Sequence, residues 1–289
     1  MSLLEELLAA APVLTDGAWG TQLQARGLTP GECPDQWNLT WPAQVEEVAR
    51  AYVEAGSRVI LSNTFGSNRI TLAGHGLAGK TVELNRAGAA ISRRAAAGRA
   101  KVFASIGPSG KMLMSGETTE DELRAAFAEQ ARALAEGGAD ALVVETMSDL
   151  AEAKIALEAA KSTGLPVVAC MVFDTGRNKD RTMMGATPEQ AAGELAEAGA
   201  DVIGANCGVG IESYIAVCRR LKAATDRPVW IKANAGLPEL VGGKTVWKMT
   251  PEVFAGFVPQ LIQAGASFIG GCCGTSPEFI RAVAGVIGR

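Results

Sequence analysis

The chain has 289 residues, of which 48% are hydrophobic and 20% are charged, and its formal net charge is −4. The acidic balance and the lack of any Lys/Arg run argue against nucleic acid or an anionic membrane surface as a partner, so we expect a small substrate. A chain of this length can bury one large core, and barrels of this size commonly form one domain. We therefore predict a single domain over residues 1–289.

The first residues predict a helix start rather than a targeting signal. They carry acidic charge before any apolar stretch, unlike a signal peptide, and Ser2 with Glu5 matches a capping box. No apolar run approaches the roughly 20 residues that span a bilayer. We therefore expect a cytoplasmic protein with no membrane partner, whose six Cys residues are metal ligands or buried side chains rather than disulfides.

Eight short apolar runs follow along the chain, with amphipathic segments of helical length between them. The runs are 12–15, 58–64, 101–106, 139–145, 166–173, 201–206, 228–234 and 267–272. A weak repeat places a glycine between a helical pattern and a run at four junctions, where it fits a helix C-terminal cap. These glycines are Gly56, Gly138, Gly199 and Gly265.

Continuous rather than alternating apolar runs are typical of parallel strands buried on both faces. Eight strand and helix pairs predict an α/β fold, a TIM-type (β/α)8 barrel. A doubly wound open sheet is the alternative, because the number of strands does not by itself show closure. No Gly-x-Gly-x-x-Gly fingerprint opens a helix after the first run, which weakens that alternative.

Polar residues gather where the predicted strands end, the side of a barrel that carries chemistry. They are Asp16, Asn63, Glu145, Asn206, Cys207, Asn234, Cys272 and Cys273. Three thiolates at strand ends predict an open zinc site on Cys207, Cys272 and Cys273, with the fourth position left for substrate, most simply another sulfur. A phosphate site in the Gly-rich turn before Thr275 is the alternative, but it would leave two consecutive thiols unexplained.

The remaining cysteines and the single histidine indicate less about function. Cys170 lies inside an apolar run and Cys218 inside a helical pattern, so both are expected to be small buried side chains. Cys33, in a Pro-bounded loop, stays ambiguous. His75 lies in a Gly-flanked loop and is expected on the surface, which argues against Ser-His-Asp or Cys-His catalysis.

Four motifs make the sequence resemble the homocysteine S-methyltransferase family along essentially the whole chain. They are Asp16-Gly17-Ala18-Trp19-Gly20-Thr21, Asn63-Thr64-Phe65-Gly66, Gly204-Ala205-Asn206-Cys207 and Gly270-Gly271-Cys272-Cys273-Gly274. The two cysteine motifs together are highly specific, whereas the first alone is weak. The residues of the first two motifs look most similar to those of the homocysteine-binding module of cobalamin-dependent methionine synthase.

The resemblance implies transfer of a methyl group to the thiol of homocysteine, giving methionine, with Zn2+ on the three cysteines and the substrate sulfur as fourth ligand. It also implies that Asp16 and Glu145 lie near the substrate ammonium and that backbone N–H groups around Ala18 and Trp19 face its carboxylate. A buried ammonium does need anionic partners. Asn63, Asn206 and Asn234 are then candidates to orient the thiolates or to occupy the zinc when substrate is absent.

The methyl donor is less defined. The chain has no room for folate or cobalamin domains after residue 289 and no long C-terminal extension of the kind found in betaine-using relatives, so we expect a separate corrinoid protein. S-methylmethionine or betaine is the alternative donor. A zinc- or homocysteine-binding module of a multi-component methyltransferase is an alternative of another class. A metal-dependent aldolase or lyase would need carboxylate and histidine ligands that these strand ends lack.

Overall fold

The strands of the computed structural model, which describes residues 1–242 and 244–288, form a ring of parallel strands. The ring strands are β1 (Val13–Leu14), β2 (Val59–Ile60), β3 (Lys101–Ile106), β4 (Ala141–Met147), β5 (Val167–Met171), β6 (Val202–Cys207), β7 (Val229–Ala233) and β10 (Ala266–Gly271). Their order is β1-β10-β7-β6-β5-β4-β3-β2. The Arg58 N–H donates to the Leu14 carbonyl at 2.8 Å, which joins the two ends of this order. The TIM-type barrel is therefore confirmed, and the open doubly wound sheet is wrong.

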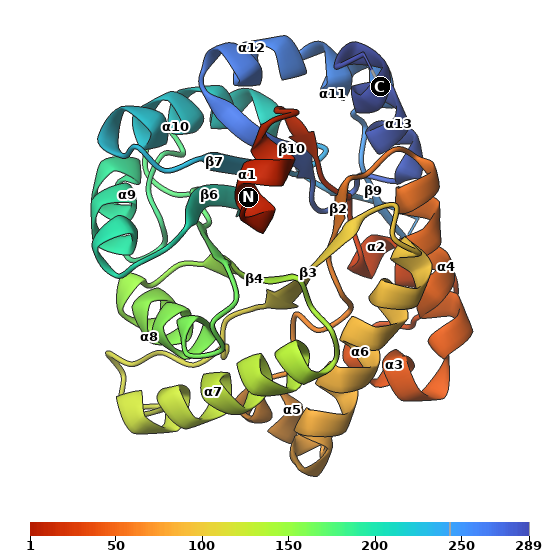
Figure 1. Cartoon of the computed structure of the whole chain (residues 1–289), viewed down its shortest axis with the longest axis vertical. Coiled ribbons are helices and arrows are strands. Elements are labelled where there is room, and N and C mark those ends of the chain that lie inside the picture. Colours follow the sequence, from red (N-terminus) through yellow and green to blue (C-terminus); the bar gives the residue numbers. More distant parts are fainter. Residues whose placement is uncertain (243, 289) are drawn as a thin grey trace.

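A ring of helices surrounds the strands, as Figure 1 shows along the barrel axis. The longer helices are α4 (Pro42–Glu54), α6 (Thr81–Ala96), α7 (Glu120–Glu136), α8 (Leu150–Lys161), α9 (Pro188–Glu197), α10 (Ile211–Ala224) and α13 (Pro277–Val286). The shorter ones are α1 (Leu3–Leu8), α2 (Gly20–Gln24), α3 (Trp37–Thr40), α5 (Arg69–Ala73), α11 (Pro251–Gly256) and α12 (Val258–Gln263), with 3-10 turns at Pro34–Gln36 and Ala78–Lys80.

Local sequence signals set many of the helix ends. Ser2 and Glu5 form the predicted capping box of α1. The four junction glycines all have positive φ, from 93° to 107°, which is the left-handed conformation expected just after a helix C-terminus. The predicted strand 58–64 is shorter in the structure, where β2 ends at Ile60, because the Leu61 N–H donates to the Asp16 carboxylate at 2.7 Å instead of joining the strand ladder.

A two-stranded hairpin, β8 (Glu239–Val241) with β9 (Lys244–Val246), follows β7 and was not predicted. The pair is antiparallel and only three residues long on each side, too short for alternation to be recognised in the sequence.

Large aromatic side chains fill the inside of the barrel. Trp230 of β7 stacks on Phe103 of β3, with ring centroids 6.0 Å apart, and lies 5.3 Å from the ring of Phe268 in β10. Leu7 of α1 packs against this inner cluster, so α1 covers the end of the barrel where the strands begin (Figure 1). The opposite end of the barrel, where the strands stop, is not covered by α1 and is where a (β/α)8 barrel carries its active site. No helix in the described part of the chain is long and apolar enough to cross a membrane.

Candidate active site

Barrel closure brings the three predicted cysteines together. The Sγ atom of Cys207, at the end of β6, lies 3.3 Å from that of Cys272 and 3.8 Å from that of Cys273, both just after β10. All three sulfur atoms lie within 4.8 Å of one another. Tetrahedral zinc with bonds of about 2.3 Å needs sulfur atoms about 3.8 Å apart, so the spacing and the chemistry of this donor set both fit that metal.

Glycines allow the turn that carries the cysteine pair. A Cβ on Gly270 would lie 2.0 Å from the Thr15 hydroxyl oxygen, and one on Gly271 would lie 2.2 Å from the Thr275 hydroxyl oxygen. Thr275 is buried, and both its hydroxyl and its N–H donate to the Cys272 carbonyl, at 2.7 and 3.1 Å. The turn that the sequence offered as a possible phosphate cradle therefore uses these donors to hold the two thiols in place.

The three thiols interact electrostatically. Hydrogen bonds to Cys272 and Cys273 raise the pKa of the Cys207 thiol, whereas hydrogen bonds with Cys207 and Cys272 lower the pKa of the Cys273 thiol. Like charges this close cannot all form without a cation, because each thiolate opposes ionisation of the next. A divalent soft cation is the partner that would allow all three thiols to ionise.

Asn206 connects the thiols to the acidic part of the site. Its amide nitrogen donates to Thr146 Oγ1 at 2.6 Å and to Glu145 Oε2 at 3.3 Å, and it lies 3.9 Å from the Cys272 sulfur. Its amide oxygen accepts from the Thr146 N–H at 2.7 Å. Tyr214 donates to the Asn206 carbonyl at 2.7 Å. Asn206 therefore lies within reach of the Cys272 sulfur, and its role in orienting a thiolate stays a prediction.

Glu145 is a buried acid whose pKa is unusual. Burial raises the pKa of its carboxyl to about 7, against the opposing effect of the Lys232 ammonium. The Ser105 hydroxyl donates to one oxygen of the carboxylate, and Asn206 contacts the other. Such an acid can switch between neutral and charged forms near neutral pH.

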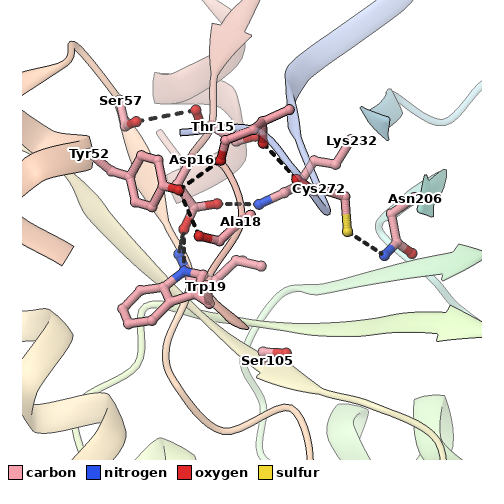
Figure 2. Close-up of polar contacts among 12 residues, drawn as sticks. Thr15, Asp16, Ala18, Trp19, Tyr52, Ser57, Ser105, Asn206, Lys232 and Cys272 are labelled. Atoms are coloured by element: carbon pink, nitrogen blue, oxygen red, sulfur yellow. Dashed lines mark hydrogen bonds and ion pairs between the residues drawn. The ribbon is translucent and has the colours of Figure 1, made fainter. Parts of the chain in front are cut away.

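Asp16 is paired with a lysine that sequence reasoning missed. Its carboxylate accepts from the Trp19 indole at 2.7 Å and from the Lys232 ammonium, as Figure 2 shows. It also accepts from the Leu61 N–H at 2.7 Å. Burial would lower the pKa of Lys232, but the Asp16 and Glu145 carboxylates raise it above its usual value. The sequence signal that could have identified Lys232 is its position inside the apolar run 228–234, which was expected to be buried on both faces. The prediction that Asp16 lies near a substrate ammonium stays a prediction.

A cavity of about 490 Å3 opens beside the thiols. Its lining includes the three cysteines, Glu145, Lys232, Asn63, Ala18 and Trp19. Asp16, Asn206 and Asn234 are buried and are not part of this lining. The Ala18 N–H donates to the Thr275 carbonyl at 2.9 Å.

The other predicted amides differ in what they contact. Asn63 donates to the Pro34 carbonyl at 2.8 Å and to Asn38 Oδ1 at 3.0 Å, so it braces the cavity wall away from the thiols. The amide nitrogen of Asn234 donates to the Gly208 carbonyl at 2.6 Å. Its amide oxygen is buried and, within the described chain, has no hydrogen-bond partner.

The cysteines outside the thiol cluster and the single histidine lie largely where the sequence predicts. Cys170 and Cys218 are buried, and His75 is exposed at the margin of the cavity. Cys33 is also buried and lines the cavity, with its sulfur 3.9 Å from Asp35 Oδ2. It is not part of the thiol cluster.

The fold and the site together define a class of protein: a (β/α)8 barrel with three cysteines at the ends of β6 and β10 that could hold a metal ion. The sequence model of the homocysteine S-methyltransferase family matches residues 13–287. The chain belongs to this family.

Known relatives agree with that assignment. The chain is 33% identical to methionine synthase of Mycobacterium leprae over 305 aligned positions and to that of Mycobacterium tuberculosis over 306, which cover 99% and 98% of this chain. It spans about a quarter, 25%, of the length of each of these relatives. The crystal structure of the homocysteine methyltransferase MmuM from Escherichia coli in its metallated form has the same fold, with a TM-score of 0.82, 24% identity, and coverage of 98% of this chain and 99% of that one.

Proposed function

We propose that this protein is a zinc-dependent methyltransferase that transfers a methyl group to the thiol of homocysteine and forms methionine. The observation that carries the proposal is the cluster of Cys207, Cys272 and Cys273 on the wall of a cavity large enough for an amino acid. Three sulfur ligands leave a fourth zinc position open, as in catalytic rather than structural sites. When bound there, zinc would lower the pKa of the incoming substrate thiol and hold it as a thiolate.

The chain's own residues would orient the acceptor beside the metal. Glu145 lines the cavity and, in its charged form, supplies the anion that a substrate ammonium needs. Asn206 contacts both Glu145 and Cys272, so it fixes the acid relative to the thiols. The unpartnered amide oxygen of Asn234 can interact with the metal centre when substrate is absent.

The reaction needs no general base from the protein. With zinc held by the three cysteines, the substrate thiol would release its proton to solvent; the sulfur electron pair would then form the bond to the methyl carbon, while the bond from methyl to the donor would break with its electrons on the donor. A donor must therefore hold the methyl on a good leaving group, such as cobalt or a sulfonium sulfur. A methyl on the tertiary amine of folate does not meet that condition without assistance.

We infer that the donor is a methylated corrinoid protein. Exposed apolar side chains lie in the loops that follow β2, β3, β5 and β7, around the open end of the barrel: Phe65, Met112, Met114, Met183, Leu237 and Leu240. Exposed apolar side chains in several of these loops suit contact with a macromolecular donor better than with a free small molecule. Docking a protein there would align cobalt, methyl and sulfur in one line. We further infer that the protein acts in the cytoplasm, where thiols stay reduced.

A donor panel tests the function. Zinc-loaded protein is mixed with homocysteine and, separately, with methylcobalamin, S-methylmethionine, betaine or methylfolate, and methionine is measured. We expect methionine from methylcobalamin, faster when a corrinoid protein presents it, and none from unassisted methylfolate.

Other outcomes of the panel would change the proposal in different ways. Turnover with S-methylmethionine or betaine but none with methylcobalamin would contradict the donor and keep the zinc chemistry. Homocysteine binding without turnover from any donor, the corrinoid protein included, would favour a zinc- and homocysteine-binding module of a larger methyltransferase.

The Glu145→Gln substitution should weaken homocysteine binding by about 1.5–3 kcal/mol, the range for losing a charge-assisted hydrogen bond, and leave zinc content unchanged. The wild-type contribution should fade as pH falls through about 7, where the Glu145 carboxyl becomes protonated. Calorimetry between pH 6 and 8.5 measures both effects, with Glu117→Gln as a control on an exposed loop. Equal affinities of the Glu145→Gln and wild-type proteins at pH 8.5 would remove Glu145 from substrate recognition.

The raised pKa of Glu145 also makes the free energy of unfolding depend on pH. Because the folded-state pKa lies above the usual 4.5, the folded protein binds this proton more tightly than the unfolded chain does. Glu145 therefore makes folding less favourable as pH rises from about 4.5 to about 7, and the Glu145→Gln protein should lack that slope in urea unfolding.

A further inference from the structure

Thr146, near the end of β4, has a backbone conformation that threonine rarely adopts. Its φ is 60°, in the left-handed region, which is unfavourable for a side chain branched at Cβ. The ladder is also irregular here: from Val144 to Met147, β4 advances by three residues while β5 advances by two, which is a bulge. As a result Glu145 and Thr146 both line the cavity, whereas regular alternation would turn one of them away.

Cys207, at the end of β6, has the same conformation. Its φ is 64°, and it lines the cavity directly after the buried Asn206. β4 and β6 therefore end in the same way, with a buried polar residue followed by a left-handed residue that faces the cavity. Such residues persist where the surrounding contacts hold them in place, and they are frequent at functional sites.

The Asn206 side chain joins these two strand ends. β5 lies between β4 and β6 in the barrel, so the strand ladder cannot connect them directly. The Asn206 amide oxygen accepts from the Thr146 N–H at 2.7 Å, and the amide nitrogen donates to the Thr146 hydroxyl oxygen at 2.6 Å. Because a backbone N–H can only donate, the first bond identifies the amide oxygen. The nitrogen must then lie on the side of the Cys272 sulfur, 3.9 Å away, as Figure 2 shows.

The bonds to Thr146 are the short ones that orient this amide. Tyr214 donates to the Asn206 carbonyl at 2.7 Å, which holds the backbone of the turn but leaves the side chain free to rotate. The contact of the amide nitrogen with Glu145 Oε2 is longer, at 3.3 Å. Thr146 therefore holds both ends of the amide of the residue that precedes Cys207.

We propose that Thr146 is a positioning residue of the metal centre. Through the Asn206 side chain it fixes the end of β6, and with it Cys207, and it directs the amide N–H toward the Cys272 thiolate. This role rests on the proposed function, because it requires the three thiols to hold zinc. Groups that orient metal ligands without touching the metal still change its affinity.

The test measures metal binding without homocysteine. Zinc affinity is obtained by competition with a chelator, and cobalt(II) replaces zinc so that its visible bands report the geometry of the thiolate ligands. Thr146→Ala removes the hydroxyl, Thr146→Ser keeps it, and Asn206→Ala removes the amide through which Thr146 would act. Thr225→Ala is the control, since its hydroxyl oxygen also accepts from a backbone N–H, that of Arg227, in the loop before β7.

We expect Thr146→Ala to bind zinc on the order of 10- to 100-fold more weakly than wild type and to change the cobalt spectrum, with Thr146→Ser and Thr225→Ala within about threefold of wild type. In the Asn206→Ala protein, Thr146→Ala should cost no more than about a further threefold, because its route to Cys207 is already lost.

A purely structural role would lower the urea midpoint of the metal-free Thr146→Ala protein and leave its zinc affinity and cobalt spectrum unchanged. That result, equal losses for Thr146→Ala and Thr146→Ser, or the full loss also in the Asn206→Ala protein would overturn the role of Thr146 and leave the proposed function standing. Wild-type protein that binds no zinc, or binds cobalt without thiolate charge-transfer bands, would overturn the proposed function and this role together.

Discussion

Cys273→Ser is expected to bind zinc on the order of 100- to 1000-fold more weakly than the wild type, and to lose methyl transfer. Structural zinc sites with four ligands bind with about 10–16 kcal/mol, so each thiolate supplies several kcal/mol, and a serine hydroxyl does not replace it. The same holds for Cys207 and Cys272, whose sulfur atoms complete the cluster. Elemental analysis after dialysis against a chelator measures the loss.

Cys33→Ser is the matched control for this experiment. Cys33 lines the same cavity but is not part of the thiol cluster, so zinc content should be unchanged. The Cys273→Ser protein should keep its fold, because the aromatic cluster inside the barrel lies below the strand ends and does not involve the metal. Full zinc retention by the Cys273→Ser protein would contradict the proposed metal site.

Trp230→Ala is expected to lower the free energy of unfolding by about 3–5 kcal/mol, the range for removing a large aromatic side chain from a core. The Trp230 side chain is 0% exposed, stacks on Phe103 and contacts Phe268. Within the described residues its indole N–H has no hydrogen-bond partner, so the loss comes from packing and the cavity alone. Urea unfolding followed by circular dichroism measures it.

Trp41→Ala provides the comparison, since that indole is 53% exposed and its loss should cost less than about 1 kcal/mol. The two variants separate the metal from the core. The cysteine variant should lose zinc and, compared with wild type after zinc has been removed from both proteins, keep its unfolding midpoint, whereas the Trp230 variant should lose stability in the same comparison. A cost below about 1 kcal/mol for Trp230→Ala would contradict the view that this side chain fills the barrel.

The barrel could be predicted because each strand is a continuous apolar run bounded by local signals. The junction glycines have the left-handed conformation that their positions implied, and β3 has its predicted bounds, Lys101–Ile106. The C-terminal end of β2 could not be predicted. It depends on Asp16, a residue 45 positions from Leu61, which takes a backbone N–H out of the ladder.

The thiol cluster could also be predicted, because the ends of parallel strands in a closed barrel meet at one face regardless of their separation in the sequence. The pairing of Asp16 with Lys232 could not. These residues are 216 positions apart, and no local pattern indicates which buried charge faces which. Nor could spacing reveal that Asn206 reaches both Glu145 and Cys272.

The sequence by itself therefore determined the elements, the fold class and the residue types at the strand ends, since hydrophobic periodicity, glycine caps and cysteine motifs are local properties of the chain. Only the tertiary structure decided which of those residues face the cavity and which do not. Glu145 lines it, whereas Asp16 is buried outside the lining and pairs with Lys232, which lines it. The physical reason is that a buried charge must find its counterion through space, and the closure of the barrel alone sets the distances between residues far apart in the sequence.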